Sequence, residues 1–70
     1  MGKEIALKTQ YAWDQQFSST INVVLGDEWR AGNLSYHLKS RPVWEGFIER
    51  KKLNQLKDYM CFDDVCVGSR

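Results

Sequence analysis

The first part of the chain alternates between larger apolar and polar side chains over residues 4–14. Alternation with a period of two is typical of a strand that buries one face, because successive side chains point to opposite sides of a sheet. The segment therefore predicts a strand. Its apolar face would hold Ile5, Leu7, Thr9, Tyr11 and Trp13, and its polar face Glu4, Lys8, Gln10 and Asp14.

Residues 20–25 predict a second strand, because this run is mostly apolar and β-branched. Branched side chains fit a pleated surface and lose conformational freedom in a helix. Gly26 and Asp27 follow, and this pair has the chemistry of a two-residue hairpin turn. A short third strand over residues 28–31 would then pair back on the second.

The same signals recur once more, because Gly32 and Asn33 form a second turn-like pair before an alternating segment at residues 34–38. The simplest interpretation of the first half of the chain is a meander of antiparallel strands. The alternative is a helix that Asp27 caps and that ends near Ser40. Gly32 would lie inside that helix and cost about 1 kcal/mol relative to Ala, so we favour the meander.

The character of the sequence changes after this point, and residues 41–58 predict one helix that packs on the sheet. Ser40 is a suitable N-cap. Trp44, Phe47 and Ile48 recur at helical spacing. A strand followed by a helix is the alternative for the same stretch.

Residues 59–67 predict a closing strand or a final hairpin, the hairpin if Asp63 and Asp64 form a two-residue turn. In that hairpin Cys61 lies opposite Cys66 in a non-hydrogen-bonded pair, with Cα atoms about 4.5 Å apart. That distance allows a disulfide. In a reducing compartment the pair would remain as two thiols.

Seventy residues allow a single domain, residues 1–70, and 43% hydrophobic content is ordinary for a folded one. The expected class is α+β: a small antiparallel sheet, a meander of three to five strands, packed by one helix within residues 41–58.

An all-β alternative comes from a resemblance. Trp29, then Gly46-Phe47-Ile48, then Leu53 is similar to the Trp, Gly-Trp-Val and Leu pattern of bacterial Src-homology-3-like barrels. The resemblance implies a small barrel in which residues 43–49 form a strand.

The chain contains little that could perform chemistry. His37 is the single histidine, and no base or orienting group can be assigned to it. The two cysteines with one distant histidine do not make a zinc site, and no glycine-rich phosphate loop is present. We therefore expect no enzymatic activity, no catalytic residue, no bound metal and no cofactor.

Charge is uneven along the chain, although the net charge is only +1. The middle of the sequence is basic, and cations in such a stretch can neutralise phosphates. A small nucleic-acid-binding protein is therefore the alternative function. Its candidate contacts are Lys39, Arg41, Arg50, Lys51, Lys52 and Lys57.

Nine aromatic residues in seventy make protein binding the favoured function. Trp and Tyr dominate the energetics of protein interfaces, and Trp29, Tyr36 and Trp44 are the candidate contacts. We expect a non-enzymatic binding or regulatory protein, of inhibitor or adaptor type, whose partner is another protein. A homodimer formed through a sheet edge is a further option.

The sequence gives no sign of a membrane partner. Its longest apolar run, residues 59–62, is far shorter than a spanning helix of about 20 residues. No continuous apolar segment near the N-terminus resembles a secretory signal. The expected location is therefore the cytoplasm.

Overall fold

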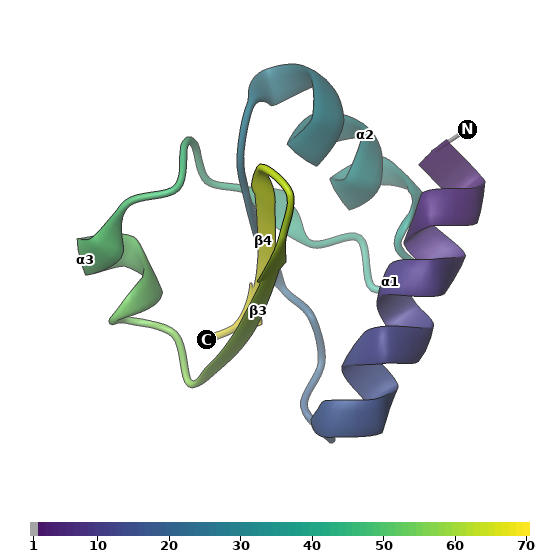
Figure 1. Ribbon diagram of the computed structural model, residues 1–70, viewed down its shortest axis with the longest axis horizontal. Coiled ribbons are helices and arrows are strands. Elements are labelled where there is room, and N and C mark those ends of the chain that lie inside the picture. The colour runs from purple at the N-terminus through teal and green to yellow at the C-terminus, as the bar shows by residue number, and fades with distance from the viewer. Residues whose placement is uncertain (1) are drawn as a thin grey trace.

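The computed structural model describes residues 2–70 and shows an α+β domain, in which a four-stranded sheet lies between helices (Figure 1). Helices α1 and α2 lie on one side of the sheet, and the short helix α3 lies on the other. In chain order the elements are α1 (Gly2–Gln16), β1 (Val23–Leu25), α2 (Glu28–His37), β2 (Val43–Trp44), α3 (Arg50–Leu53), β3 (Asp58–Phe62) and β4 (Val65–Ser69).

The sheet is mixed, with the strand order β2-β1-β4-β3. Strand β1 pairs in parallel with β2 and antiparallel with β4, and β3 pairs only with β4. The parallel pair needs a crossover, and α2 supplies it between β1 and β2. The last strand in the chain therefore lies inside the sheet, and β2 and β3 form its two edges.

Each face of the sheet has its own apolar cluster, because neighbouring side chains of a strand point to opposite faces. The larger cluster lies under α1 and α2 and includes Trp13, Val24, Leu34 and Val67. The smaller one lies toward α3. It joins Val23, Leu25 and Cys66 to the partly buried Leu53 and Leu56.

The strand predicted over residues 4–14 is wrong, because this segment is the centre of α1. Leu7 and Tyr11, which a strand would have buried, are 66% and 69% exposed. The segment consists mostly of good helix formers, and neither Gly nor Pro interrupts it. The buried positions follow helical spacing of three and four residues: Ala6, Thr9 and Trp13.

The turns and strands predicted between residues 26 and 38 are also wrong, and the alternative helix is what the structure shows. Asp27 is the N-cap of α2, and its side chain accepts a hydrogen bond from the backbone N–H of Arg30 at 2.7 Å. Burial of one helical face outweighs the cost of Gly32 inside the helix. The buried positions of this face are Ala31, Leu34 and Leu38.

No single helix spans residues 41–58, so that prediction is wrong and the alternative of a strand followed by a helix is correct. Trp44 belongs to β2, where it pairs with Val24, and its indole N–H donates to the carbonyl of Gly26 at 2.8 Å. Gly46 has a φ of 92°, a left-handed conformation that ends the strand and prevents a continuous helix.

The expected α+β class is confirmed, but the sheet is mixed and is neither the antiparallel meander that the sequence predicts nor a barrel. The sheet contains one parallel pair, and it remains open because β2 and β3 are not paired with each other. The strand that the barrel resemblance placed at residues 43–49 is limited to Val43–Trp44. The strand predicted over residues 20–25 is shortened to β1, and both of its faces are buried.

Of the two alternatives for residues 59–67, the structure shows the hairpin, with its two-residue turn at Asp63 and Asp64. Cys61 pairs with Cys66 in the register that the sequence predicts. Asp63 has a φ of 51°, which aspartate tolerates better than most residues. The hairpin is the part of the fold whose local sequence signals determine its structure directly.

Replacing Gly32 with Ala is expected to raise the free energy of unfolding by up to about 1 kcal/mol, because Ala favours a helix interior. A Cβ at this position meets no atom within 4 Å. Urea unfolding followed by circular dichroism measures the change. The control is Gly68→Ala. Its Cβ would lie 2.6 Å from Leu56 Cδ1 and 3.0 Å from the carbonyl oxygen of Asp58. This variant should therefore lower the free energy of unfolding. Destabilisation by Gly32→Ala would contradict the packing described for α2.

Candidate protein-binding groove

A groove of about 720 Å³ lies between α1, α2 and the β3–β4 hairpin. Its lining is mostly apolar. Met60, Phe62 and Val65 form the floor, and they point to the helix side of the sheet. Ile5 on α1 and Trp29 on α2 stand in the walls.

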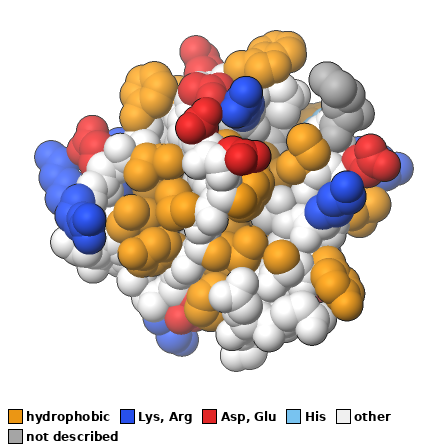
Figure 2. Space-filling model, in the orientation of Figure 1, with side chains coloured by type: hydrophobic (Ala, Val, Ile, Leu, Met, Phe, Trp, Pro, Cys, Tyr) orange, Lys and Arg blue, Asp and Glu red, His pale blue; other side chains and the backbone are white. Residues whose placement is uncertain are grey.

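The two wall residues are unusually exposed for their type. Trp29 is 76% exposed and Ile5 is 51% exposed. In Figure 2, hydrophobic side chains are exposed on both sides of a band of white backbone, and only those on the side of α1 and α2 belong to the face that carries the groove. An exposed apolar patch on a small protein is typical of an interaction site.

Charged side chains stand around this apolar floor. Arg30 forms an ion pair with Asp64 across the end of the groove, with a distance of 3.1 Å between Nη1 and Oδ2. Lys8 and Asp63 also line the groove. Lys8 has no ion-pair partner among residues 2–70, so its charge is available to a bound molecule.

Only one of the three aromatic candidates from the sequence lies at the groove. Trp29 lines it, whereas Trp44 is half-buried against the core and donates its indole N–H to a backbone carbonyl. Tyr36 is exposed near the C-terminal end of α2. The guanidinium of Arg41 lies 4.8 Å from the Tyr36 ring centroid, and His37 meets the same ring edge-on.

Sequence reasoning missed Ile5, Met60 and Phe62 as site residues. Ile5, Lys8, Thr9 and Ala12 fall on one helical face, and this spacing is visible in the sequence once α1 is recognised as a helix. The floor residues carry no comparable signal, because their position in the groove depends on the place of β3 in the sheet.

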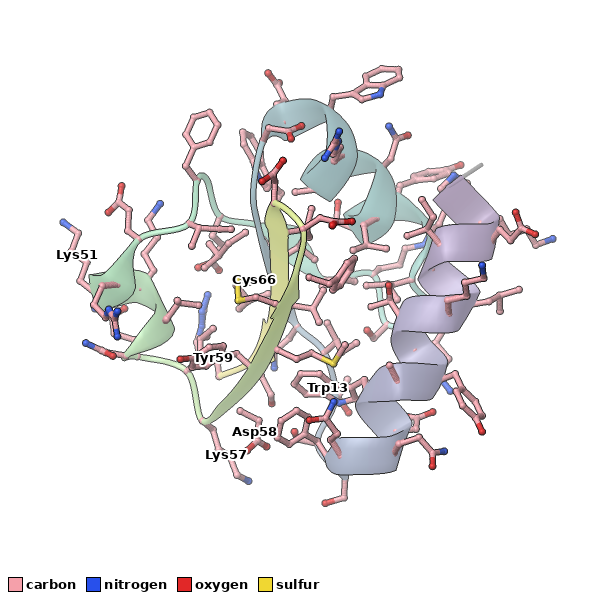
Figure 3. All side chains as sticks on the ribbon, viewed as in Figure 1. Trp13, Lys51, Lys57, Asp58, Tyr59 and Cys66 are labelled. Carbon is pink, nitrogen blue, oxygen red and sulfur yellow. A yellow bond between two sulfur atoms is a disulfide. The ribbon has the colours of Figure 1, made fainter. Side chains whose placement is uncertain are left out.

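The six basic candidates do not gather in one place. Lys39 and Arg41 follow α2, next to Leu38 of the larger core cluster. Arg50, Lys51 and Lys52 belong to α3 on the opposite side of the sheet (Figure 1). Lys57 precedes β3, and in Figure 3 its side chain points away from the lower end of that strand.

Lys52 has a structural role in the loop before α3. Its ammonium donates to the carbonyl oxygens of Glu45 at 3.1 Å and of Phe47 at 3.0 Å. It also lies 3.8 Å from the carboxylate of Glu49. These contacts hold residues 45–47 in place and leave little of its charge for an external anion.

Cys61 and Cys66 are joined by a disulfide bond on the face of the sheet toward α3. Disulfides persist in oxidising compartments and are rare in the cytosol. The bond is therefore at odds with the cytoplasmic location expected from the sequence, which stays a prediction. Among residues 2–70, no helix has the length and apolar content needed to cross a bilayer.

The described part of the chain brings no three His, Cys, Asp or Glu side chains together in a way that would hold a metal ion. His37 packs beside Tyr36 and close to Gly2, and no ion pair within residues 2–70 involves it. Comparisons with protein families, with curated proteins and with solved structures find no match to this chain.

Loss of the disulfide is expected to lower the free energy of unfolding by about 2 kcal/mol, because the bond restricts the unfolded chain. Thermal unfolding of the protein with and without reductant measures the effect. The double variant Cys61→Ala with Cys66→Ala is the control, and reductant should not change its midpoint. Equal midpoints for the oxidised and reduced protein would contradict a stabilising bond.

Proposed function

We propose that this protein is a non-enzymatic regulatory protein, of adaptor or inhibitor type, that binds an apolar helix of a partner protein in the groove. The observation that carries the proposal is the apolar floor of Met60, Phe62 and Val65 between two exposed wall residues. Trp29, the more exposed of these, is of the residue type that most often dominates interface energetics.

A helix suits the groove because the backbone of its walls and floor is hydrogen-bonded, apart from the outer edge of β3. Two walls are helices, α1 and α2, and the floor lies on the face of a hairpin. An occupant therefore finds few backbone donors or acceptors and must satisfy its own, as a helix does. A volume of about 720 Å³ has room for a few large side chains from one helical face.

Charge adds a requirement on the partner. Lys8 lines the groove without an ion-pair partner among the described side chains. A partner helix with an acidic residue beside its apolar anchors would complement that charge. Such a rim contact contributes more to specificity and association rate than to affinity.

Nucleic acid binding, the alternative, has less support. Its six cations are divided between the two sides of the sheet, and Lys52 is engaged with loop carbonyls. A phosphate backbone requires cations that follow a continuous path. The basic residues therefore do not form a surface that compares with the groove.

Ile5→Glu is expected to reduce recovery of the partner at least tenfold in affinity capture from the native cell extract, because it brings a carboxylate into an apolar contact. Leu7→Glu is the matched control, because Leu7 lies on the same helix and is 66% exposed but does not line the groove. That variant should recover the partner as well as the unmodified protein does.

A photo-reactive phenylalanine analogue in place of Trp29 identifies the bound segment. The expected product is a crosslink to a helix with apolar residues three, four and seven positions apart. Equal recovery by both Glu variants, or recovery of nucleic acid alone, would rule the proposal out.

A further inference from the structure

Strand β3 has a complete unpaired edge. Within residues 2–70 it pairs only with β4, and it is the last strand in the order β2-β1-β4-β3. In Figure 1 it lies in front of β4, and no labelled helix or strand passes in front of it. Edge strands of this length expose backbone groups that can pair with another chain.

The pairing within the hairpin determines which backbone groups face outward. Cys61 and Cys66 form a closely spaced pair, with Cα atoms 4.0 Å apart, as in the non-hydrogen-bonded positions of an antiparallel ladder. Residues 58, 60 and 62 therefore bond to β4. The N–H and C=O groups of Tyr59 and Cys61 point to the open edge, and neither residue bonds elsewhere within residues 2–70.

We propose that two copies of this protein form a symmetric dimer in which their β3 strands pair antiparallel, with the two-fold axis at Met60. In this register Tyr59 of each copy lies opposite Cys61 of the other. All the outward N–H and C=O groups of both strands are then used, in four backbone hydrogen bonds. The two sheets join into one sheet of eight strands.

Charge complementarity supports the same register. Lys57 and Asp63 flank β3 at its two ends. Antiparallel pairing about Met60 places Lys57 of each copy beside Asp63 of the other copy. Both side chains are exposed, and no ion pair within residues 2–70 involves either of them. The dimer therefore contains two ion pairs, one at each end of the new ladder.

The two neighbouring registers, centred on Tyr59 and on Cys61, are less favourable for strand pairing. Pairing centred on Tyr59 would oppose Lys57 to Cys61, but the backbone N–H of Lys57 already donates to Ser69 at 2.8 Å. Pairing centred on Cys61 would oppose Asp58 to Asp64, and like charges opposite each other destabilise a sheet. In the Met60 register Asp58 faces Phe62 instead.

The side chains at the new contact are also compatible. Asp58 keeps its existing partner, because its carboxylate accepts a hydrogen bond from the Ser19 hydroxyl at 2.7 Å. Met60, which also belongs to the groove floor, lies opposite its counterpart on the helix side of the sheet, and Tyr59 lies opposite Cys61 on the side toward α3. Figure 3 shows Asp58 and Tyr59 on opposite sides of the strand, as this arrangement requires.

Sedimentation equilibrium tests the dimer of this 8.2 kDa chain. Lys57→Glu and Asp63→Lys should each weaken dimerisation about tenfold, because each variant creates two like-charge pairs. An equal mixture of the two variants should recover the affinity, since their heterodimer restores both ion pairs. Lys51→Glu is the control, because it changes the charge as much as Lys57→Glu does but lies on α3. It should have no effect on dimerisation.

Asp63 has a left-handed backbone, so Asp63→Lys also strains the turn. Asp63→Asn keeps the turn and should weaken dimerisation less than the reversal does. Ile5→Glu, which tests the groove, should leave dimerisation unchanged, so the two proposals can fail separately.

An isotope-filtered nuclear Overhauser experiment on mixed labelled and unlabelled protein tests the register. The expected signal joins Hα of Asp58 in one copy to Hα of Phe62 in the other, and these residues lie at opposite ends of the strand within one chain. A monomer at concentrations up to about 1 mM would overturn the proposal. A dimer without this signal would overturn it as well.

Discussion

The fold depends on the complete burial of β1, a strand of only three residues. Val23, Val24 and Leu25 are each at most 2% exposed, and they have neighbouring strands on both sides. A strand that is apolar on both faces needs a cover on each face. Helices α1 and α2 provide one cover, and the chain between β2 and β3 provides the other through Leu53 and Leu56. The division of this small protein into three layers follows from that requirement.

The class of the fold and the closing hairpin could be predicted from the sequence, because turn chemistry and cysteine spacing are local signals. The identity of the first two helices could not be predicted correctly. In α1 larger apolar residues alternate with polar ones along the sequence, but the side chains buried against the core include small or polar residues such as Ala6 and Thr9. In α2 the capping by Asp27 and the burial of one face outweighed an internal glycine. Local propensity was therefore overruled by contacts that a single segment does not reveal.

The same limit applies to the groove. Trp29 could be named as an interface candidate from its residue type, and the structure places it at the wall. The floor comes from β3 and β4, more than 25 positions further along the chain, and no short-range pattern connects the two. The basic stretch shows the reverse case, in which residues that are close in sequence do not form one surface. Arg41 follows α2, and Arg50 belongs to α3 on the other side of the sheet from α2.

The position of β4 has a consequence for how the protein acquires its structure. Of the seven elements it is the last to be synthesised, yet it lies between β1 and β3 and is the only strand that connects them. Until residues 65–69 are available, β1 lacks its antiparallel neighbour and β3 has no sheet to join. Contacts between distant parts of the chain slow folding, because a long loop must close before they form. The domain is therefore expected to acquire its core after β4 has left the ribosome, in one late and concerted step.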